Sequence, residues 1–207
     1  DGWYDAQTGG TEITSTTIVT ATAAHTLYAH WAPKSYEVSF DANGGTAVSA
    51  TLPVTFGMVY GTLLPTTTRT GYTFDGWYTE ATGGTKILPT TTVTTASDHT
   101  LYAHWIANTY EVTFDPNGGT LVGSATKNVT YDSEYGVLPS ATKQGYIFEG
   151  WFTDPTGGTQ ITTGSTVAIT AAQTLYAHWR AAEMTVTFDA NGGTLVGSAT
   201  KRVTYDS

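Results

Sequence analysis

The chain has 207 residues, and 17 acidic against 8 basic side chains give it a formal net charge of −9. It has no cysteine, which excludes disulfide scaffolds and cysteine-ligated zinc or iron–sulfur sites. So few Lys and Arg cannot provide the basic surface that binds a phosphate backbone, so we expect no nucleic-acid partner. No apolar run approaches the roughly 20 residues of a membrane-spanning helix, and we expect no membrane insertion by this fragment.

The composition favours β structure. Threonine accounts for 45 residues and aromatic side chains for 13%, whereas only 12% of residues are charged. β-Branched and aromatic residues are enriched in strands, and the 23 glycines supply turns. Hydrophobic residues make up 40% of the chain, enough to offset the entropy of ordering the backbone, so the chain should fold.

A long repeat with a fixed period organises the chain. Trp77 and Trp151 lie 74 apart, as do Phe40 and Phe114, and the string HTLYAHW at 25 and 99 returns as QTLYAHW at 173. The period predicts a back segment (1–35, the C-terminal part of a truncated repeat), a first full repeat (36–109), a second full repeat (110–183) and a front segment (184–207, the N-terminal part of another). We therefore expect an excerpt from a longer array.

Each repeat is long enough to be a domain of its own. A period of 74 residues exceeds the length of solenoid repeats, which is roughly 20–50 residues. A domain of about 60 residues already buries about 60% of its unfolded surface. We therefore interpret the chain as beads on a string. Four residues separate the last Trp of one unit from the next strand, too few for free tumbling, so a semi-rigid rod is expected.

The sequence of the second full repeat predicts three strands before its closing strand. Alternation at Tyr110, Val112 and Phe114 predicts a half-buried strand, and the Asn117-Gly118 turn that follows favours a hairpin. The second strand is expected in 126–131. A third strand is expected over 145–152, where Gly150 marks a bulge that re-aims Trp151.

The rest of the repeat adds a turn and a closing strand. The segment 134–139 predicts a short helical turn or a connector that ends at Pro139. The closing strand places Leu175, Ala177 and Trp179 on one face. Four or five short strands and one helical turn give a small β-rich α+β domain with a mixed sheet.

No constellation of an enzyme, metal centre or cofactor site stands out. The run Asp115-x-Asn117-Gly118 resembles the opening of a calcium loop, but no Glu closes it at the spacing of an EF-hand. His99 and His104 could suggest a metal pair, yet Gln173 replaces the first histidine in the next repeat. The glycines follow no phosphate-binding pattern. We expect no enzyme activity, no cofactor and no metal.

The aromatic residues leave two interpretations open. Two Trp per unit at fixed strand positions are what a core would use, but exposed Trp and Tyr also stack on sugar rings. The binding alternative names these residues: Trp77, Tyr78, Tyr102, Trp105, Trp151, Tyr176 and Trp179.

The ordered motifs FDxNGGT, YGxLP, GYxFxGWY/F and LYAHW resemble the Listeria-Bacteroides repeat, the family of the internalin B-type B repeats. The resemblance implies a β-grasp-like (ubiquitin- or SUMO-like) domain in tandem on secreted or wall-attached bacterial surface proteins. It carries no catalytic residues. The closing His-Trp pairs, such as His104-Trp105, depart from the YAQF-like ending common in internalin-type repeats, so no member's partner transfers to this chain.

Two functions follow as expectations. The first is a non-enzymatic, extracellular surface module that acts as a semi-rigid stalk and contacts a protein or glycan on a host or neighbouring cell surface. The second is a tandem carbohydrate-binding module that uses exposed Trp and Tyr.

Overall fold

Every regular element among residues 1–206, which the computed structural model describes, is a β-strand. The chain divides into two compact units. The first holds Asp1–Thr67 and Phe74–His104, and the second holds Thr68–Thr73 and the chain from Trp105 onward. The expected α+β class is therefore wrong in its α component, because no residue in 1–206 is helical.

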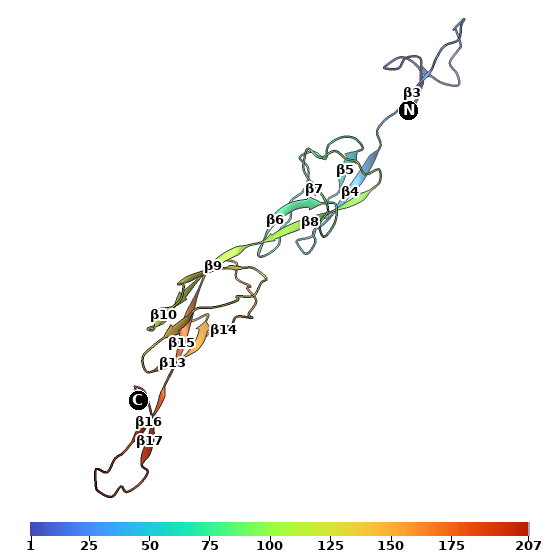
Figure 1. Ribbon diagram of the computed structural model, residues 1–207. Coiled ribbons are helices and arrows are strands. Elements are labelled where there is room, and N and C mark those ends of the chain that lie inside the picture. The colour runs from blue at the N-terminus through green and yellow to red at the C-terminus, as the bar shows by residue number, and fades with distance from the viewer. Residues whose placement is uncertain (207) are drawn as a thin grey trace. The chain divides into compact units, whose positions relative to one another are not determined.

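Two sheets belong mainly to the first unit. One has the order β2-β1-β3, and the other, of five strands, has the order β5-β4-β8-β6-β7. The five strands of the larger sheet are labelled in Figure 1. In the larger sheet β4 runs parallel to β8, and the register places Phe40 opposite Leu101. The strand bounds are β1 (Gly2–Tyr4), β2 (Glu12–Ile13), β3 (Tyr28–His30), β4 (Ser35–Asp41), β5 (Leu52–Thr55), β6 (Tyr72–Tyr78), β7 (Lys86–Ile87) and β8 (His99–Ala107).

The second unit holds a five-stranded sheet in the order β11-β9-β15-β13-β14 and two two-stranded sheets, β10-β12 and β16-β17. In the five-stranded sheet β9 runs parallel to β15, and Phe114 lies opposite Leu175. The strand bounds are β9 (Thr109–Asp115), β10 (Thr120–Val122), β11 (Thr126–Thr130), β12 (Ser140–Thr142), β13 (Tyr146–Phe152), β14 (Gln160–Ile161), β15 (Gln173–Ala181), β16 (Glu183–Thr187) and β17 (Thr200–Thr204).

The two full repeats build the same core from matching positions. β4 and β9 alternate buried and exposed residues identically, because successive side chains of a strand point to opposite faces. The inward residues are Val38 and Phe40 in β4 and Val112 and Phe114 in β9. They lie beside the buried side chains of the closing strand, which is β8 in the first full repeat and β15 in the second. The matched core pairs are Val38/Val112, Phe40/Phe114, Val54/Val129, Tyr60/Tyr135, Trp77/Trp151, Val93/Val167, Leu101/Leu175 and Ala103/Ala177.

The bulge expected at Gly150 is confirmed. The register between β13 and β15 shifts between Phe148 and Gly150, where Gly150 has a φ of 132°. The extra residue lets Phe148 and Trp151 both point into the core, where their rings meet edge to face at 5.5 Å. Glycine is required because this positive φ strains any L side chain.

Of the two alternatives expected for 134–139, the helical turn is wrong, and the segment is a connector. Its backbone amides bond to another segment instead of to the preceding turn: Tyr135 N–H donates to Ser165 O (2.9 Å) and Gly136 N–H to Thr163 O (2.8 Å). Glu134 forms an isolated antiparallel bridge with Thr166. Partners in 163–166 therefore satisfy these amides without a helix.

The Asn-Gly turn forms, and the strands that flank it pair, but through a longer connection than a tight hairpin. Gly119 N–H donates to Pro116 O at 2.9 Å, and Asn117 and Gly118 both have positive φ. β9 pairs antiparallel with β11 as expected. The residues between them include β10, which pairs with β12 and not with β9.

Candidate functional site

The first Trp of each full repeat is a core residue. Trp77 and Trp151 are each 2% exposed. Phe40 and Phe74 pack on the Trp77 ring, and Phe114 and Phe148 pack on Trp151. Each indole N–H donates to a proline carbonyl, Pro65 O or Pro139 O, at 2.7 Å. Rings covered on their faces and bonded at their edges have no surface left for a sugar to stack on.

The second Trp of each full repeat lies half-buried at the margin of the core. The indole N–H of Trp179 donates to Pro116 O at 3.0 Å, and its ring centroid lies 5.5 Å from that of Phe148. A Cβ at Gly119 would come within 2.4 Å of the Trp179 ring, so this turn needs glycine. Trp105 is half-buried at the matching position.

The outer face of each sheet carries the remaining aromatic candidates. Tyr78 and Tyr102 are half-buried on this face, and so are Phe152 and Tyr176 in the second full repeat, where the register places those two opposite each other. The ring of His104 stacks on Tyr78 at 3.8 Å, and His178 stacks on Phe152 at 3.9 Å. We call each group, Tyr78-Tyr102-His104 and Phe152-Tyr176-His178, the outer aromatic strip.

The histidines of the strip are held as hydrogen-bond donors. Nε2 of His104 lies 2.9 Å from Glu80 O, and Nε2 of His178 lies 2.8 Å from Asp154 O. A carbonyl oxygen only accepts, so Nε2 must carry the proton in both rings. Within residues 1–206 no cluster of three His, Cys, Asp or Glu side chains could hold a metal ion.

The Asp-x-Asn turn uses its carboxylate for its own backbone. Asp115 Oδ1 accepts the N–H of Asn117 at 2.8 Å, and Asp41 and Asp189 make the same contact in their turns. The side-chain amide of Asn117 donates to Pro155 O (2.9 Å) and Ala177 O (3.0 Å). The side chain of Asn117 therefore ties the turn to the closing strand by a hydrogen bond, so the polar residues of this Asx turn stabilise the fold.

Sequence reasoning missed the hydrogen-bond partner that explains why Gln173 can stand where the first full repeat has His99. His99 Nδ1 lies 2.9 Å from Ser97 O and its Nε2 lies 2.8 Å from the hydroxyl of Tyr60. Nδ1 must donate to that carbonyl, so Nε2 accepts from the tyrosine. In the second full repeat the Tyr135 hydroxyl donates to Gln173 Oε1 at 2.9 Å. Burial raises the pKa of both tyrosines. The sequence signal that could have found this partner is the tyrosine, Tyr60 or Tyr135, that recurs in each full repeat.

One charged cluster is particular to the first full repeat. Lys86 Nζ donates to Asp75 Oδ1 at 2.7 Å, and the Tyr78 hydroxyl donates to Asp75 Oδ2. These hydrogen bonds lower the pKa of Asp75 and raise the pKa of Lys86 and Tyr78. At the matching position Gln160 donates to Glu149 O, a backbone carbonyl, at 2.9 Å. A cluster that changes between two near-copies makes a poor common site.

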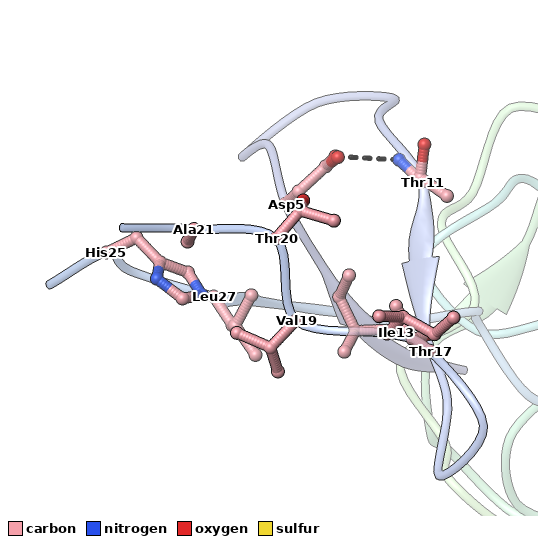
Figure 2. Close-up of a pocket in the computed structure, with 10 residues that line it drawn as sticks. Asp5, Thr11, Ile13, Thr17, Val19, Thr20, Ala21, His25 and Leu27 are labelled. Atoms are coloured by element: carbon pink, nitrogen blue, oxygen red, sulfur yellow. Dashed lines mark hydrogen bonds between the residues drawn. The ribbon is translucent and has the colours of Figure 1, made fainter. Parts of the chain in front are cut away.

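The pocket in the back segment is the uncovered core face of a repeat. Figure 2 shows its lining, which includes Ile13, Val19 and Leu27, with Asp5 Oδ1 accepting the N–H of Thr11 at 2.7 Å. The three apolar side chains match Ile87, Val93 and Leu101, all buried in the first full repeat. Residues 1–35 contain no counterpart of the β4 residues that cover them there. The pocket is therefore lined by residues whose counterparts form the core of the first full repeat.

The comparisons with known proteins agree with this architecture. The Listeria-Bacteroides repeat domain matches the chain at residues 1–30, 36–104 and 110–178. The chain belongs to the Listeria-Bacteroides repeat family. No helix in the described part of this repeat array is long and apolar enough to cross a membrane.

Three relatives place such repeats in larger proteins. A protein of Evansella cellulosilytica named as a Gly-rich membrane protein is 36% identical over 83% of this chain and 20% of its own length. A second protein of that organism, named as a membrane protein, is 34% identical over 83% of this chain and 25% of its own length. Internalin H of Listeria monocytogenes is 45% identical over 45% of this chain and 16% of its own length. The chain thus spans a quarter or less of the curated relatives it matches.

Proposed function

We propose that this chain is a non-enzymatic spacer in a bacterial surface protein, in which tandem repeats hold another part of the protein away from the cell. The observation that carries the proposal is the use of the repeated polar residues: Asn117, His178 and Trp151 all bond to carbonyls of their own repeat. These recurrent polar side chains therefore stabilise the fold of each copy. Repetition of one fold adds reach and valency.

The sheet order supports a β-grasp-like fold, with one domain for each sequence period. In the first full repeat the strands run second, first, fifth, third and fourth across the sheet, and the first and last strands are parallel at its centre. The five main strands of the second full repeat follow the same order. The connection between the second and third of these strands, where a β-grasp domain carries its helix, contains the non-helical segment 134–139 here.

The location outside the cell rests on the relatives. Two are named as membrane proteins and one as an internalin, and this chain would form part of a similar surface protein. The net charge of −9 and the absence of cysteine suit such an exposed, soluble segment. Adhesion to a host or neighbouring cell would then come from these repeats or from whatever they display.

Small-angle scattering tests the spacer role. Deleting 110–183 joins Thr109 to Met184 in the register of the repeat, so the shortened chain differs from the full chain by one unit. We expect the maximum dimension to fall with the deletion, because each repeat adds length. An unchanged maximum dimension would mean that the repeats fold back on one another, and the spacer proposal would fail.

A second candidate function, sugar binding, is favoured by the outer aromatic strip. Tyr102 and Tyr176 are half-buried on that strip beside the stacked histidines, so part of each ring is accessible. A glycan array read with the full chain tests it. Binding that weakens in both Tyr102→Ser and Tyr176→Ser, but persists in Phe188→Ser, which removes an exposed ring outside the strip, would support it. No binding to any glycan would remove it.

A further inference from the structure

We propose that the Gly-Tyr loop of one repeat is a docking element for the Tyr-Asp turn of the next repeat, so that each joint in the array is a specific interface. The loops are 69–72 and 143–146, and the turns that they meet are 131–132 and 205–206. All four segments lie in the second unit. As an account of stiffness, the inference rests on the spacer function proposed above.

The first contact is a hydrogen bond made twice with the same geometry. The Tyr146 hydroxyl donates to Asp206 Oδ2 at 2.9 Å, and the Tyr72 hydroxyl donates to Asp132 Oδ2 at 2.9 Å. In both cases the partners are 60 residues apart. These bonds raise the pKa of Tyr146 and of Tyr72. A bond from a hydroxyl to a carboxylate is among the stronger hydrogen bonds.

The second contact is a ring pair whose loop tyrosine also contacts a cation. Tyr146 meets Tyr205 edge to face at 5.5 Å, and Tyr72 meets Tyr131 in the same way at 5.5 Å. Lys143 Nζ lies 4.4 Å from the centroid of Tyr146, and Arg69 Cζ lies 4.0 Å from that of Tyr72. The loop tyrosine thus contacts both a cation of its own loop and an aromatic ring of the next repeat.

The third contact runs through the connecting residues. Ala182 N–H donates to Gly145 O at 2.8 Å, and its carbonyl accepts from Tyr205 N–H at 3.0 Å. Asn108 makes the same two bonds, to Gly71 O and from Tyr131 N–H, each at 2.9 Å. The linker therefore pairs with the loop behind it and with the turn ahead of it, which leaves it little freedom.

Glycine in the loop is required by the neighbour it meets. A Cβ on Gly145 would lie 2.4 Å from the ring of Tyr205, and a Cβ on Gly71 would lie 2.3 Å from the ring of Tyr131. Both glycines also have positive φ, 78° and 77°. The turn residues Asp132 and Asp206 have positive φ as well, 64° and 59°, so a recurrent backbone shape presents each acceptor.

The turn at 56–57 in the first full repeat matches 131–132 with both residues changed. Phe56 occupies the position of Tyr131 and its N–H donates to Lys34 O at 2.9 Å, the same linker bond. Gly57 stands in place of Asp132, with a φ of 80°. Phe56 is 43% exposed. An array can thus contain joints with and without the Tyr–Asp bond, and we expect the former to be stiffer.

The test measures the distance between the two full repeats in the whole chain. The chain has no cysteine, so Ala96→Cys and Thr170→Cys provide two spin labels at matching exposed positions. A docked joint predicts one narrow peak in the distance distribution. Asp132→Gly keeps the positive φ, as Gly57 does, but removes the acceptor. We expect it to lower the ratio of docked to undocked joints about tenfold, as the loss of one hydrogen bond does.

A matched pair of glycine variants separates docking from backbone strain. Gly71→Ala and Gly83→Ala place a Cβ at similar positive φ, 77° and 73°, but only the former meets a neighbour. Gly71→Ala should lose the narrow peak while Gly83→Ala keeps it. A broad distribution in the unaltered chain, or an equal response to both alanines, would overturn the proposal. A mobile joint would still let the scattering dimension grow with repeat number, so the two proposals fail separately.

Discussion

The back segment and the first full repeat carry identical strings with different burial. DGWY occupies 1–4 and 75–78, and HTLYAHW occupies 25–31 and 99–105. Trp3 is 58% exposed, whereas Trp77 is 2% exposed. Val19 is 77% exposed, whereas its counterpart Val93 is fully buried. The difference teaches that the motif alone does not bury its Trp. A parallel partner such as β4, which supplies Val38 and Phe40, completes the core.

The largest expected effect comes from truncating the covered indole. Trp77→Ala should lower the free energy of unfolding of the first full repeat by about 3–5 kcal/mol, because it leaves a cavity among packed aromatic rings. Trp3→Ala, the same change in the same string, should cost less than about 0.5 kcal/mol. Scanning calorimetry of the full chain measures both. Equal losses would contradict the importance of the partner strand.

A smaller effect tests the side chain that fastens the first turn. Asn117→Ala removes two hydrogen bonds, to Pro155 O and Ala177 O, and should cost about 1–3 kcal/mol. Asn191→Ala in the front segment is the control, since Asn191 has a similar φ (43° against 46°) and is exposed. Denaturant unfolding followed by circular dichroism compares them. If the control loses as much, the cost lies in the backbone alone.

An exchange between the two full repeats should be close to neutral. His99→Gln supplies the acceptor that Gln173 offers to Tyr135, so we expect a change below about 0.5 kcal/mol. His99→Leu leaves the Tyr60 hydroxyl without its partner and should cost about 1–3 kcal/mol. Urea titration of both variants decides. A glutamine variant as unstable as the leucine variant would show that more than the acceptor matters.

The smallest effect concerns pH and again separates the two full repeats. Hydrogen bonds from Lys86 and Tyr78 lower the pKa of Asp75. The stabilisation that follows is present above the unfolded-state pKa of the carboxyl and is lost as pH falls through the lower, folded-state value. Lys86→Met should raise the pKa of Asp75 in a carboxyl NMR titration. Gln160→Met, its counterpart in the second full repeat, should leave that pKa unchanged.

Much of the fold could be predicted because its signals are local. The alternation at Val112 and Phe114 predicted a strand, and Gly150 predicted the bulge. The helical turn at 134–139 could not be excluded, because the carbonyls that accept from its amides, Ser165 O and Thr163 O, lie much further along the chain, beyond β13 and β14. Hydrogen bonds to residues distant in the sequence determine the conformation of that segment.

The candidate site was harder to predict, because its contacts also join residues that are distant in the sequence. Two of the aromatic residues named for sugar binding, Trp77 and Trp151, are covered by phenylalanines from other strands and from their own. The joint residues Tyr72 and Asp132 gave no signal, since each belongs to a different repeat and the sequence period compares only like positions. Contacts across a joint need the structure.

Hydrogen exchange of the indole N–H groups tests most directly the claim that this motif builds a core and that its partner strand completes it. One NMR experiment on the full chain reads all six Trp residues, assigned with single Trp→Phe variants. The account predicts that the indole protons of Trp77 and Trp151, each bonded to a proline carbonyl, exchange far more slowly than those of the exposed Trp3 and Trp31. Equal exchange at all of these positions, or protection of Trp77 that depends on added glycan, would contradict it.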